Sequence, residues 1–535
     1  MTEVAHHSSD ARRRWSVAQP YVVNAALALI IGTMLAIMFA VQHRGHWWGD
    51  DWALYIRQAE GLLDGNPGKV GDENVFTTTM SAGAPFSPGL YPWGFPFLLA
   101  LAIPFVGSGV DDLVIVPFLG ALAFALGWYG LAKPRIGAPT ALVGLIAVCF
   151  TPLLLGWAEL IQSEFPFAAA VMLTLVWLDR LIARDGLLGI DERWLSLVLL
   201  GFGAFFAFET RREGFGLIPA IAAAQLVVLI GRRGRGEPAP WRLPRRELRH
   251  LAARCAVPHA TALVLVVAAK VLLPTVIVPK LEGVSAANIW TRKRKHVGHL
   301  AELAGFKRPG IDHANVFGSV RFGWTVVVIW LILFGAGVVL AFTLNRQRDA
   351  HLVVYILVAG ALGTSFSATL SRYLVSVAPL ISLLALTAVV TLAGWKRRWI
   401  GVVVATALLI PIAGANLHDA NKRIDNAERF EEYNQIEWGA QHPDAIEMFD
   451  QVKALTEPND IVASPKGRAM VLETGRRSVQ VDDYRPMPTL VTPDLVVTDM
   501  GSKRVAELAN NPSYREAWRN SRFVLYTLVA NDSPT

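Results

Sequence analysis

Long apolar stretches recur along most of this 535-residue chain, and no other feature restricts its fold as strongly. A stretch of roughly 20 apolar residues crosses the hydrocarbon core of a bilayer. The first such stretch covers 21–41, and none of comparable apolarity follows about residue 418. Hydrophobic residues make up 53% of the chain and charged residues 17%, which is too apolar for a soluble protein of this length. We therefore expect a polytopic α-helical membrane protein.

The basic residues set the expected topology. Lys and Arg gather in short loops between the apolar stretches, most densely in 231–249, and the positive-inside rule places such loops in the cytoplasm. Counting from a cytoplasmic N-terminus at 1–20, we predict about 13 transmembrane helices within 21–418. An odd number of crossings puts residues 419–535 on the extracytoplasmic side. The protein is thus expected in the cytoplasmic (inner) membrane.

Two assignments decide that count. We predict one span at about 92–108 and a pair of short spans at about 138–148 and 150–162. With them, most basic loops fall inside, and Lys133 and Arg135 are the exception that falls outside. If the short pair were a single span, every later loop would change sides.

The formal net charge of +7 does not indicate a nucleic-acid partner. The basic residues follow the loops of a membrane protein, where the positive-inside rule already accounts for them. We therefore expect membrane lipids as partners and no nucleic acid.

Residues 419–535 have the pattern of a water-soluble unit. A charged helical stretch is followed by short β-rich runs at 460–465, 477–483 and 522–530, which alternate with helical segments. This alternation predicts a C-terminal extracytoplasmic α/β domain. It contains no glycine-rich phosphate loop and no metal-ligand spacing, so we expect a substrate-binding or structural cap instead of an independent enzyme.

The loop after the first span, 43–88, is polar and rich in Trp and carboxylates. Its segment HWWGDDWALYIRQAEGLLDGN predicts an amphipathic helix along the outer surface, with Asp51 and Tyr55 on one face. Asp50 and Asp51 stand where this helix begins. A carboxylate there either caps the helix or, at the mouth of a membrane bundle, acts as a general base on an acceptor hydroxyl.

Arginines stand at the outer ends of two later spans. Arg211 and Arg212 lie in ETRREG, and Arg372 lies in SRYLVSVAP. A guanidinium fork binds phosphate oxygens in pairs, so these side chains are candidate ligands of a lipid phosphate. The alternative is that they reach toward lipid headgroups or pair with the neighbouring glutamates.

Further carboxylates precede the span predicted at 165–181. Glu159 and Glu164 are candidates for a second acidic or acceptor-binding site, together with Tyr55 of the first outer loop. The run SPGLYPWGFP has three prolines and two glycines just before the second span. It predicts a re-entrant approach that lines a substrate entrance, or a simple helix break.

These motifs, in this order, resemble those of the C-type integral-membrane glycosyltransferases, which have the GT-C fold. The likeness is to the bacterial aminoarabinose transferase and protein O-mannosyltransferase group and to actinobacterial arabinosyl- and mannosyltransferases. It covers essentially the whole chain. The motifs that carry it are GDDWALYIRQA, SPGLYPWGFP, QSEFPF, TRREG, SRYLVSVAP and, in the C-terminal unit, NDIVASP and LETGRRSVQVDD.

The resemblance implies inverting transfer of a sugar from a polyprenyl-phosphate donor to a cell-envelope glycan, lipid or protein at the outer face of the cytoplasmic membrane. It implies that Asp51 is the catalytic base, with Asp50 as its neighbour or alternative. Arg211 and Arg372 correspond to ligands of the donor phosphate, and Arg212 is a third candidate. Relatives with lipid monophosphate donors need no metal, so no cofactor is expected, although a divalent metal stays an open alternative.

Two other functions fit a polytopic protein of this kind. A lipid or polysaccharide transporter or flippase would show internal repeats and ionisable residues in the middle of its spans. The sequence shows no detectable repeat, and its acidic residues gather at one face, which favours chemistry at the membrane surface. A surface-polysaccharide polymerase or ligase would use a diphosphate-linked donor, and a donor assay distinguishes it from an enzyme that uses a monophosphate.

Overall fold

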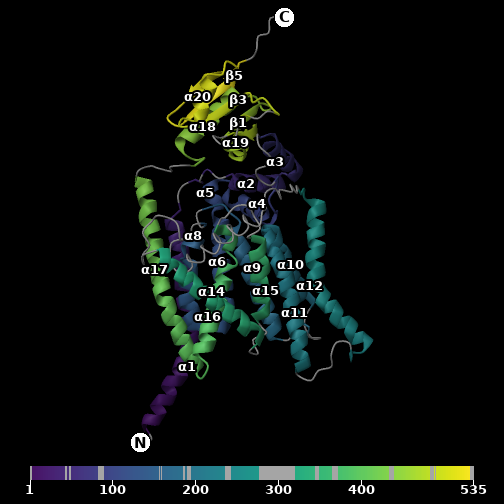
Figure 1. The fold of residues 1–535 in the computed structure, drawn as a ribbon, viewed down its shortest axis with the longest axis vertical. Coiled ribbons are helices and arrows are strands. Elements are labelled where there is room, and N and C mark those ends of the chain that lie inside the picture. Colours follow the sequence, from purple (N-terminus) through teal and green to yellow (C-terminus); the bar gives the residue numbers. More distant parts are fainter. Residues whose placement is uncertain are drawn as a thin grey trace.

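The protein consists of a body of long helices and an α/β unit that caps one end of it (Figure 1). We call the capped end the sheet end and the opposite end, from which the N-terminal part of α1 projects, the far end. The computed structural model describes residues 3–42, 45–46, 48, 50–81, 89–155, 157, 160–184, 187–188, 194–234, 242–275, 320–343, 349–363, 371–432, 439–481, 487 and 490–529.

Within these ranges, most of the body consists of helices that run roughly along its long axis (Figure 1). They are α1 (Glu3–Ala40), α6 (Ile115–Ile136), α7 (Ala138–Cys149), α9 (Glu164–Ala183), α10 (Trp194–Thr210), α11 (Leu217–Gly234), α12 (Arg245–Leu272), α14 (Val320–Thr343), α15 (Ala350–Gly363), α16 (Ala378–Ala393) and α17 (Arg398–Glu432). Stretches long and apolar enough to cross a membrane occur in α1, α6, α9, α11, α12 and α17. The chain is a multi-pass membrane protein.

Shorter helices complete the body, and several of them build the sheet end (Figure 1). They are α2 (Asp51–Leu63), α3 (Pro67–Met80), α4 (Gly94–Val106), α5 (Val110–Leu113), α8 (Pro152–Leu155) and the 3₁₀-helices η1 (Arg212–Gly216) and η4 (Ser371–Leu374). The segments α2 and α3 lie between the helical body and the α/β unit.

The segment predicted as a span at 92–108 does not cross the body. It forms the 13-residue helix α4, and the residues at both of its ends lie at the sheet end of the body. Gly94, at its start, packs closely against the backbone of Glu209 at the sheet end. Just after it, Asp111 accepts a hydrogen bond of 2.6 Å from the Gly45 amide at the same end. The prediction was wrong because apolar composition does not distinguish a re-entrant helix from a crossing one.

The two short spans predicted within 138–162 form a single pass. At the far end, the hydroxyls of Thr140 in α7 and Thr406 near the start of α17 share a hydrogen bond of 2.8 Å. The chain then reaches the sheet end, where the Ile161 amide donates to Nε2 of His46 at 3.1 Å. A break at the end of α7 separates the apolar residues into two runs, and the sequence alone does not show that both belong to one crossing.

These two errors offset each other. Removing two crossings from thirteen leaves eleven, which is also odd, so every loop after residue 163 keeps its predicted side. Lys133 and Arg135 instead lie at the far end, near Arg180 in the last turn of α9. The one exception to the positive-inside rule in the prediction therefore disappears.

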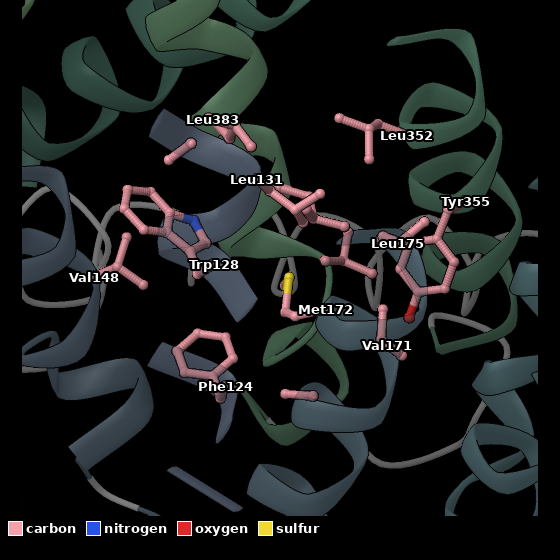
Figure 2. Packing of buried hydrophobic residues seen from close by; sticks show 14 of the residues in the cluster. Phe124, Trp128, Leu131, Val148, Val171, Met172, Leu175, Leu352, Tyr355 and Leu383 are labelled. Atoms are coloured by element: carbon pink, nitrogen blue, oxygen red, sulfur yellow. The ribbon is translucent and has the colours of Figure 1, made fainter. Parts of the chain in front are cut away.

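The core of the body follows regular helical spacing. Phe124, Trp128 and Leu131 recur every three or four residues on α6 and are completely buried. Figure 2 shows Met172 of α9 in the same cluster. A side-chain carbon at Gly127 of α6 would come within 2.7 Å of Met172, so the close contact between these two helices depends on that glycine.

The α/β unit is a five-stranded mixed sheet with the strand order β2-β1-β3-β5-β4. β1 pairs in parallel with β2 and β3, whereas β5 is antiparallel to β3 and β4. Its elements are α18 (Pro443–Leu455), β1 (Ile461–Ser464), α19 (Gly467–Thr474), β2 (Arg477–Gln480), β3 (Leu495–Asp499), α20 (Lys503–Ala509), β4 (Tyr514–Arg519) and β5 (Phe523–Leu528). Because α17 continues to Glu432, the boundary predicted at 418–419 lies inside a helix.

The α/β unit rests on α2 and α3. The Gln480 amide in β2 donates a hydrogen bond of 2.7 Å to the Ser81 hydroxyl at the end of α3. Trp52 and Ile56 of α2 are buried in the same hydrophobic cluster as Phe449 of α18. Shared apolar burial therefore holds the unit over the sheet end of the body.

Candidate active site

Asp50 and Asp51 stand at the beginning of α2. The helix is the amphipathic one predicted from the sequence, and Trp52, Tyr55 and Ile56 on it are buried. Asp50 occupies the N-cap position, but its side chain makes no capping hydrogen bond. A side-chain cap therefore does not account for Asp50, and the hydrogen-bond partners of Asp51 lie elsewhere in the fold.

Asp51 is held by three residues from separate parts of the chain. The Tyr91 hydroxyl donates to Oδ1 at 2.5 Å, and Nη1 of Arg372 donates to Oδ2 at 2.8 Å. Nη1 of Arg468 lies 3.8 Å from Oδ1. These partners come from the segment before α4, from η4 and from α19, so the tertiary fold builds this site.

Arg468 comes from the α/β unit, and the sequence did not single it out. Its Nε donates to Oδ1 of Asn74 at 2.8 Å, and its Nη1 donates to the Tyr91 hydroxyl at 3.3 Å. The side chain is almost fully buried between α19 and the helices below it. The sequence signal that could have pointed to it is an arginine placed beside the apolar residues of GRAMVLET.

Tyr91 was also missed as a single residue, although it lies in the proline-rich run predicted to line an entrance. Its ring packs against Tyr55 with centroids 4.6 Å apart. The Tyr55 hydroxyl in turn lies 3.4 Å from the Ser163 hydroxyl. Tyr55 therefore packs against Tyr91. None of the recorded hydrogen bonds joins Tyr55 to Asp51.

A second ion-pair group adjoins the first. Nη1 of Arg211 donates to Oε1 of Glu164 at 2.6 Å, and Nη2 donates to Oε1 of Glu213 at 2.9 Å. Nε of Arg372 lies 3.9 Å from the same oxygen of Glu164. The guanidinium groups of Arg211 and Arg372 both lie over the ring of Tyr373, at 5.3 and 5.5 Å from its centroid. The structure thus brings together the predicted candidates Asp51, Glu164, Arg211 and Arg372.

Two other predicted candidates are not part of this network. Arg212 pairs with Glu209 at 3.0 Å, lies over the ring of Phe208, and has 41% of its side chain exposed. Its charge is therefore neutralised at the margin of the site. Glu159 lies outside the described residues.

Three polar atoms in this network are buried and have no hydrogen-bond partner in the described part of the chain: Nε of Arg372, Oε2 of Glu164 and Oδ1 of Asp50. Leaving such an atom unsatisfied costs roughly 1–3 kcal/mol, so it is uncommon without a functional reason. The first atom is a donor and the other two are carboxyl oxygens. Together they suit a ligand that carries both anionic and hydroxyl groups.

The two neighbouring carboxyl groups differ in acidity. Burial opposes ionisation of Asp51, but the two nearby arginines and the Tyr91 hydroxyl outweigh it and lower the pKa below the usual range. At Asp50 burial prevails over the attraction of Arg468 and raises the pKa above its usual value. Asp51 is therefore the carboxylate that stays ionised over the wider pH range.

No group of three or more His, Cys, Asp or Glu side chains within the described ranges is arranged to hold a metal ion. The carboxylates of the site instead bind guanidinium groups, as at Asp51 and Glu164. Arginine and lysine have no lone pair to offer a metal under ordinary conditions.

An apolar groove begins beside this network. It has a volume of about 730 Å³ and lies between α4, α6, α9 and α10. Along α9 its lining runs from Pro166, two residues after Glu164, to Trp177, which is about 16 Å farther along the helix axis. Leu101, Phe105 and other apolar side chains of the lining are exposed at the surface of the body.

Solved structures of similar fold cover nearly the whole chain. The crystal structure of ArnT from Cupriavidus metallidurans bound to undecaprenyl phosphate shares 12% identity, covers 94% of this chain and 98% of that chain, and gives a TM-score of 0.52. The same protein in the apo state shares 14% identity, with 96% and 99% covered and a TM-score of 0.53. The arabinofuranosyltransferase AftD from Mycobacteria shares 13% identity, with 95% and 40% covered and a TM-score of 0.53.

No protein-family model matches the chain. No curated protein matches it in sequence either. The structural matches nevertheless show that the chain has a GT-C-like fold, as the resemblance of its motifs predicted. This likeness rests on structure.

Proposed function

We propose that this chain is a glycosyltransferase that moves a sugar from a polyprenyl-phosphate donor to a glycan, lipid or protein of the cell envelope. The reaction would take place at the outer face of the cytoplasmic membrane, with the α/β unit on the extracytoplasmic side. The observation that carries the proposal is the partly buried carboxylate of Asp51, which is held by Arg372 at the sheet end of a bundle with this fold. Fold alone does not assign an activity, so the proposal depends on the chemistry of this site.

Asp51 is suited to act as the general base. Its pKa is lowered, so the carboxylate is ionised and can accept a proton at neutral pH. Each carboxylate oxygen has two lone pairs, and the recorded hydrogen bonds from Tyr91 and Arg372 use one on each. An acceptor hydroxyl can therefore approach without displacing either partner. These two bonds also fix the orientation of the carboxylate.

Arg372 and Arg211 are suited to bind the donor phosphate. Nε of Arg372 is a buried donor with no partner among the described groups, and a phosphate oxygen is the strongest acceptor it could meet. Arg211 lies beside it and is tied to Glu164 and Glu213, which hold its position. Guanidinium groups fixed in this way stabilise the negative charge that grows on a leaving phosphate.

The apolar groove offers a place for the polyprenyl chain. It begins at Pro166, next to the charged network, and its lining is almost entirely apolar. ArnT, which has a similar fold, has been crystallised with undecaprenyl phosphate. A lipid phosphate bound by Arg372 could extend its first isoprene units into this groove, and burial of those units would add binding energy that orients the donor.

The reaction follows from these positions. Asp51 removes the proton of the acceptor hydroxyl, and the hydroxyl oxygen attacks the anomeric carbon from the side opposite the phosphate. The bond between that carbon and the phosphate oxygen breaks, and polyprenyl phosphate leaves with the electron pair. Because attack and departure occur on opposite faces, the configuration at the anomeric carbon is inverted.

The test is sugar transfer by the purified protein from radiolabelled polyprenyl-phosphate sugars to cell-envelope acceptors. We expect transfer by wild type and loss of transfer in a folded Asp51→Asn variant. Transfer from a diphosphate-linked donor alone would instead favour a polymerase or ligase. Movement of the labelled lipid between leaflets without any glycosidic product would favour a flippase.

A further inference from the structure

A second cavity lies on the far side of the apolar groove from the active site. It has a volume of about 600 Å³ and lies between α6 and α9. It shares Leu173 and Trp177 with the groove described above, so the two are neighbours along α9. Its polar lining consists of Tyr129, Lys133 and Arg180.

This cavity lies at the level of the far leaflet. Arg180 follows Glu164 by 16 residues on α9, which places it about 24 Å from the active site along the helix axis. A bilayer core is roughly 30 Å thick, so this depth corresponds to the boundary with the opposite headgroups. Leu126 and Leu173, which also line the cavity, are 45% and 47% exposed, so it opens toward lipid.

Its polar groups are incompletely paired. No described carboxylate forms an ion pair with Lys133 or Arg180, although Arg135 and Asp179 beside them pair with each other. The Tyr129 side chain is only 7% exposed, and its hydroxyl has no hydrogen-bond partner in the part of the chain that the structure describes. Basic side chains at helix ends commonly reach toward headgroups, but a buried, unpaired hydroxyl beside them requires a more specific explanation.

We propose that this cavity binds the headgroup of an anionic phospholipid from the leaflet opposite the active site. Lys133 and Arg180 contact the phosphate, and the Tyr129 hydroxyl donates a hydrogen bond to it. The acyl chains lie along Leu126, Leu173 and Trp177, in the direction of the apolar groove. The positive charges of Lys133 and Arg180 favour a lipid with a net negative charge over a zwitterionic lipid.

The experiment is native mass spectrometry of the purified full-length protein with phosphatidylglycerol or phosphatidylcholine added in detergent. Wild type should retain phosphatidylglycerol preferentially. The double variant Lys133→Gln/Arg180→Gln should bind it roughly 30-fold more weakly, since two cations near an anionic headgroup are removed. Tyr129→Phe should weaken binding roughly tenfold, because it removes only one charge-assisted hydrogen bond.

A matched control is the double variant Lys396→Gln/Arg397→Gln. These residues lie between α16 and α17 at the same end of the body, so the charge change is the same, but they do not line the cavity. The control should bind phosphatidylglycerol as wild type does. Equal retention of both lipids by wild type, or equal loss in the control, would overturn the proposal. Two results together would mean that the site takes a free anion and not a lipid. They are displacement of phosphatidylglycerol by millimolar inorganic phosphate, and unchanged lipid selectivity in Tyr129→Phe.

Discussion

Two arginine clusters occupy opposite ends of the helical body, and they differ in how completely their hydrogen bonds are used. At the far end, Arg135 donates to Asp349 at 2.9 Å, to both oxygens of Asp179 at 2.5 and 2.9 Å, and to a backbone carbonyl at 2.8 Å. Every nitrogen of that guanidinium is engaged. At the sheet end, Nε of Arg372 and Oε2 of Glu164 are buried with no recorded partner in the described ranges.

The difference indicates two different roles. A guanidinium with a partner on every nitrogen, which connects α6, α9 and the residue before α15, is already committed to its neighbours, so it serves the stability of the bundle. A guanidinium with an unused buried donor retains that capacity, and it stands beside an ionised carboxylate and an apolar groove. Substitutions at the sheet end should therefore lower turnover more than stability, and substitutions at the far end should lower stability more than turnover.

The largest effect is expected for Asp51→Asn. The amide cannot accept the proton of an acceptor hydroxyl, so turnover should fall by roughly 10²–10⁴-fold while the fold is retained. Single-turnover transfer from a saturating polyprenyl-phosphate sugar measures this loss. Asp64→Asn, at the exposed end of the same helix, is the matched control and should remain near wild type. Equal activity in both variants would remove Asp51 from the mechanism.

At the far end, Arg135→Met should act on stability instead. It leaves Asp179 and Asp349 without their cation, and breaking such a buried pair costs about 3–5 kcal/mol. Unfolding in detergent should therefore occur at clearly milder conditions, whereas turnover per folded molecule should be unchanged. Adding Asp349→Asn should recover part of the lost stability, since one unpaired charge is then removed. A fall in turnover with normal stability would contradict the division between the two ends.

Arg372→Lys should reduce turnover by roughly 10²-fold without loss of stability. Lysine keeps the charge but lacks the planar fork and the Nε donor that we assign to the donor phosphate. The steady-state kinetics of donor use measure the effect. Arg212→Lys is the comparison, because Arg212 is half-exposed and pairs with Glu209. Its turnover should change by less than about twofold, and a loss as large as that of Arg372→Lys would mean that the phosphate lies at the margin of the site.

The same contrast explains which parts of the site could be predicted from sequence. Arg211 and Arg372 were singled out because each is a charge at the end of an apolar stretch, and Asp51 because it begins an amphipathic helix in the first outer loop. Arg468 and Tyr91 were missed because 377 residues separate them, and only the docking of the α/β unit brings them to 3.3 Å. No local period or motif records such a contact.

The fold was predictable to a similar extent. Hydropathy identified the helical bundle, and charge predicts the sides of its loops, because both patterns follow from the energetics of the bilayer. The behaviour of α4 and of the segment 138–162 was not predictable, since a re-entrant helix and a broken crossing have the same apolar composition as a regular span. Tertiary contacts, such as Asp111 with Gly45, decide between them.

Arg468→Gln should produce a smaller loss with a distinctive dependence on pH. The charge of Arg468 helps to lower the pKa of Asp51, so its removal should raise that pKa. Because the base works only when ionised, activity that wild type keeps at acidic pH should be lost, and the acidic limb of kcat/KM should move to higher pH. At neutral pH the loss should be about tenfold or less. Arg519→Gln, in an exposed pair of the same unit, should leave the profile unchanged.

The smallest effect is expected for Asp50→Asn, and it determines which carboxylate of the pair is the base. Burial raises the pKa of Asp50, so its carboxyl group becomes neutral at a higher pH than that of Asp51. An amide resembles a neutral carboxyl group, so the variant and wild type should converge as the pH falls through that raised pKa. Above it, the variant should differ by less than about fivefold, because Oδ1 of Asp50 has no recorded hydrogen bond within the described residues to lose. The opposite result would be loss of transfer at every pH in Asp50→Asn together with an active Asp51→Asn. In that case Asp50 would be the base. The arginines around Asp51 would then hold a structural carboxylate, as Arg135 does at the far end.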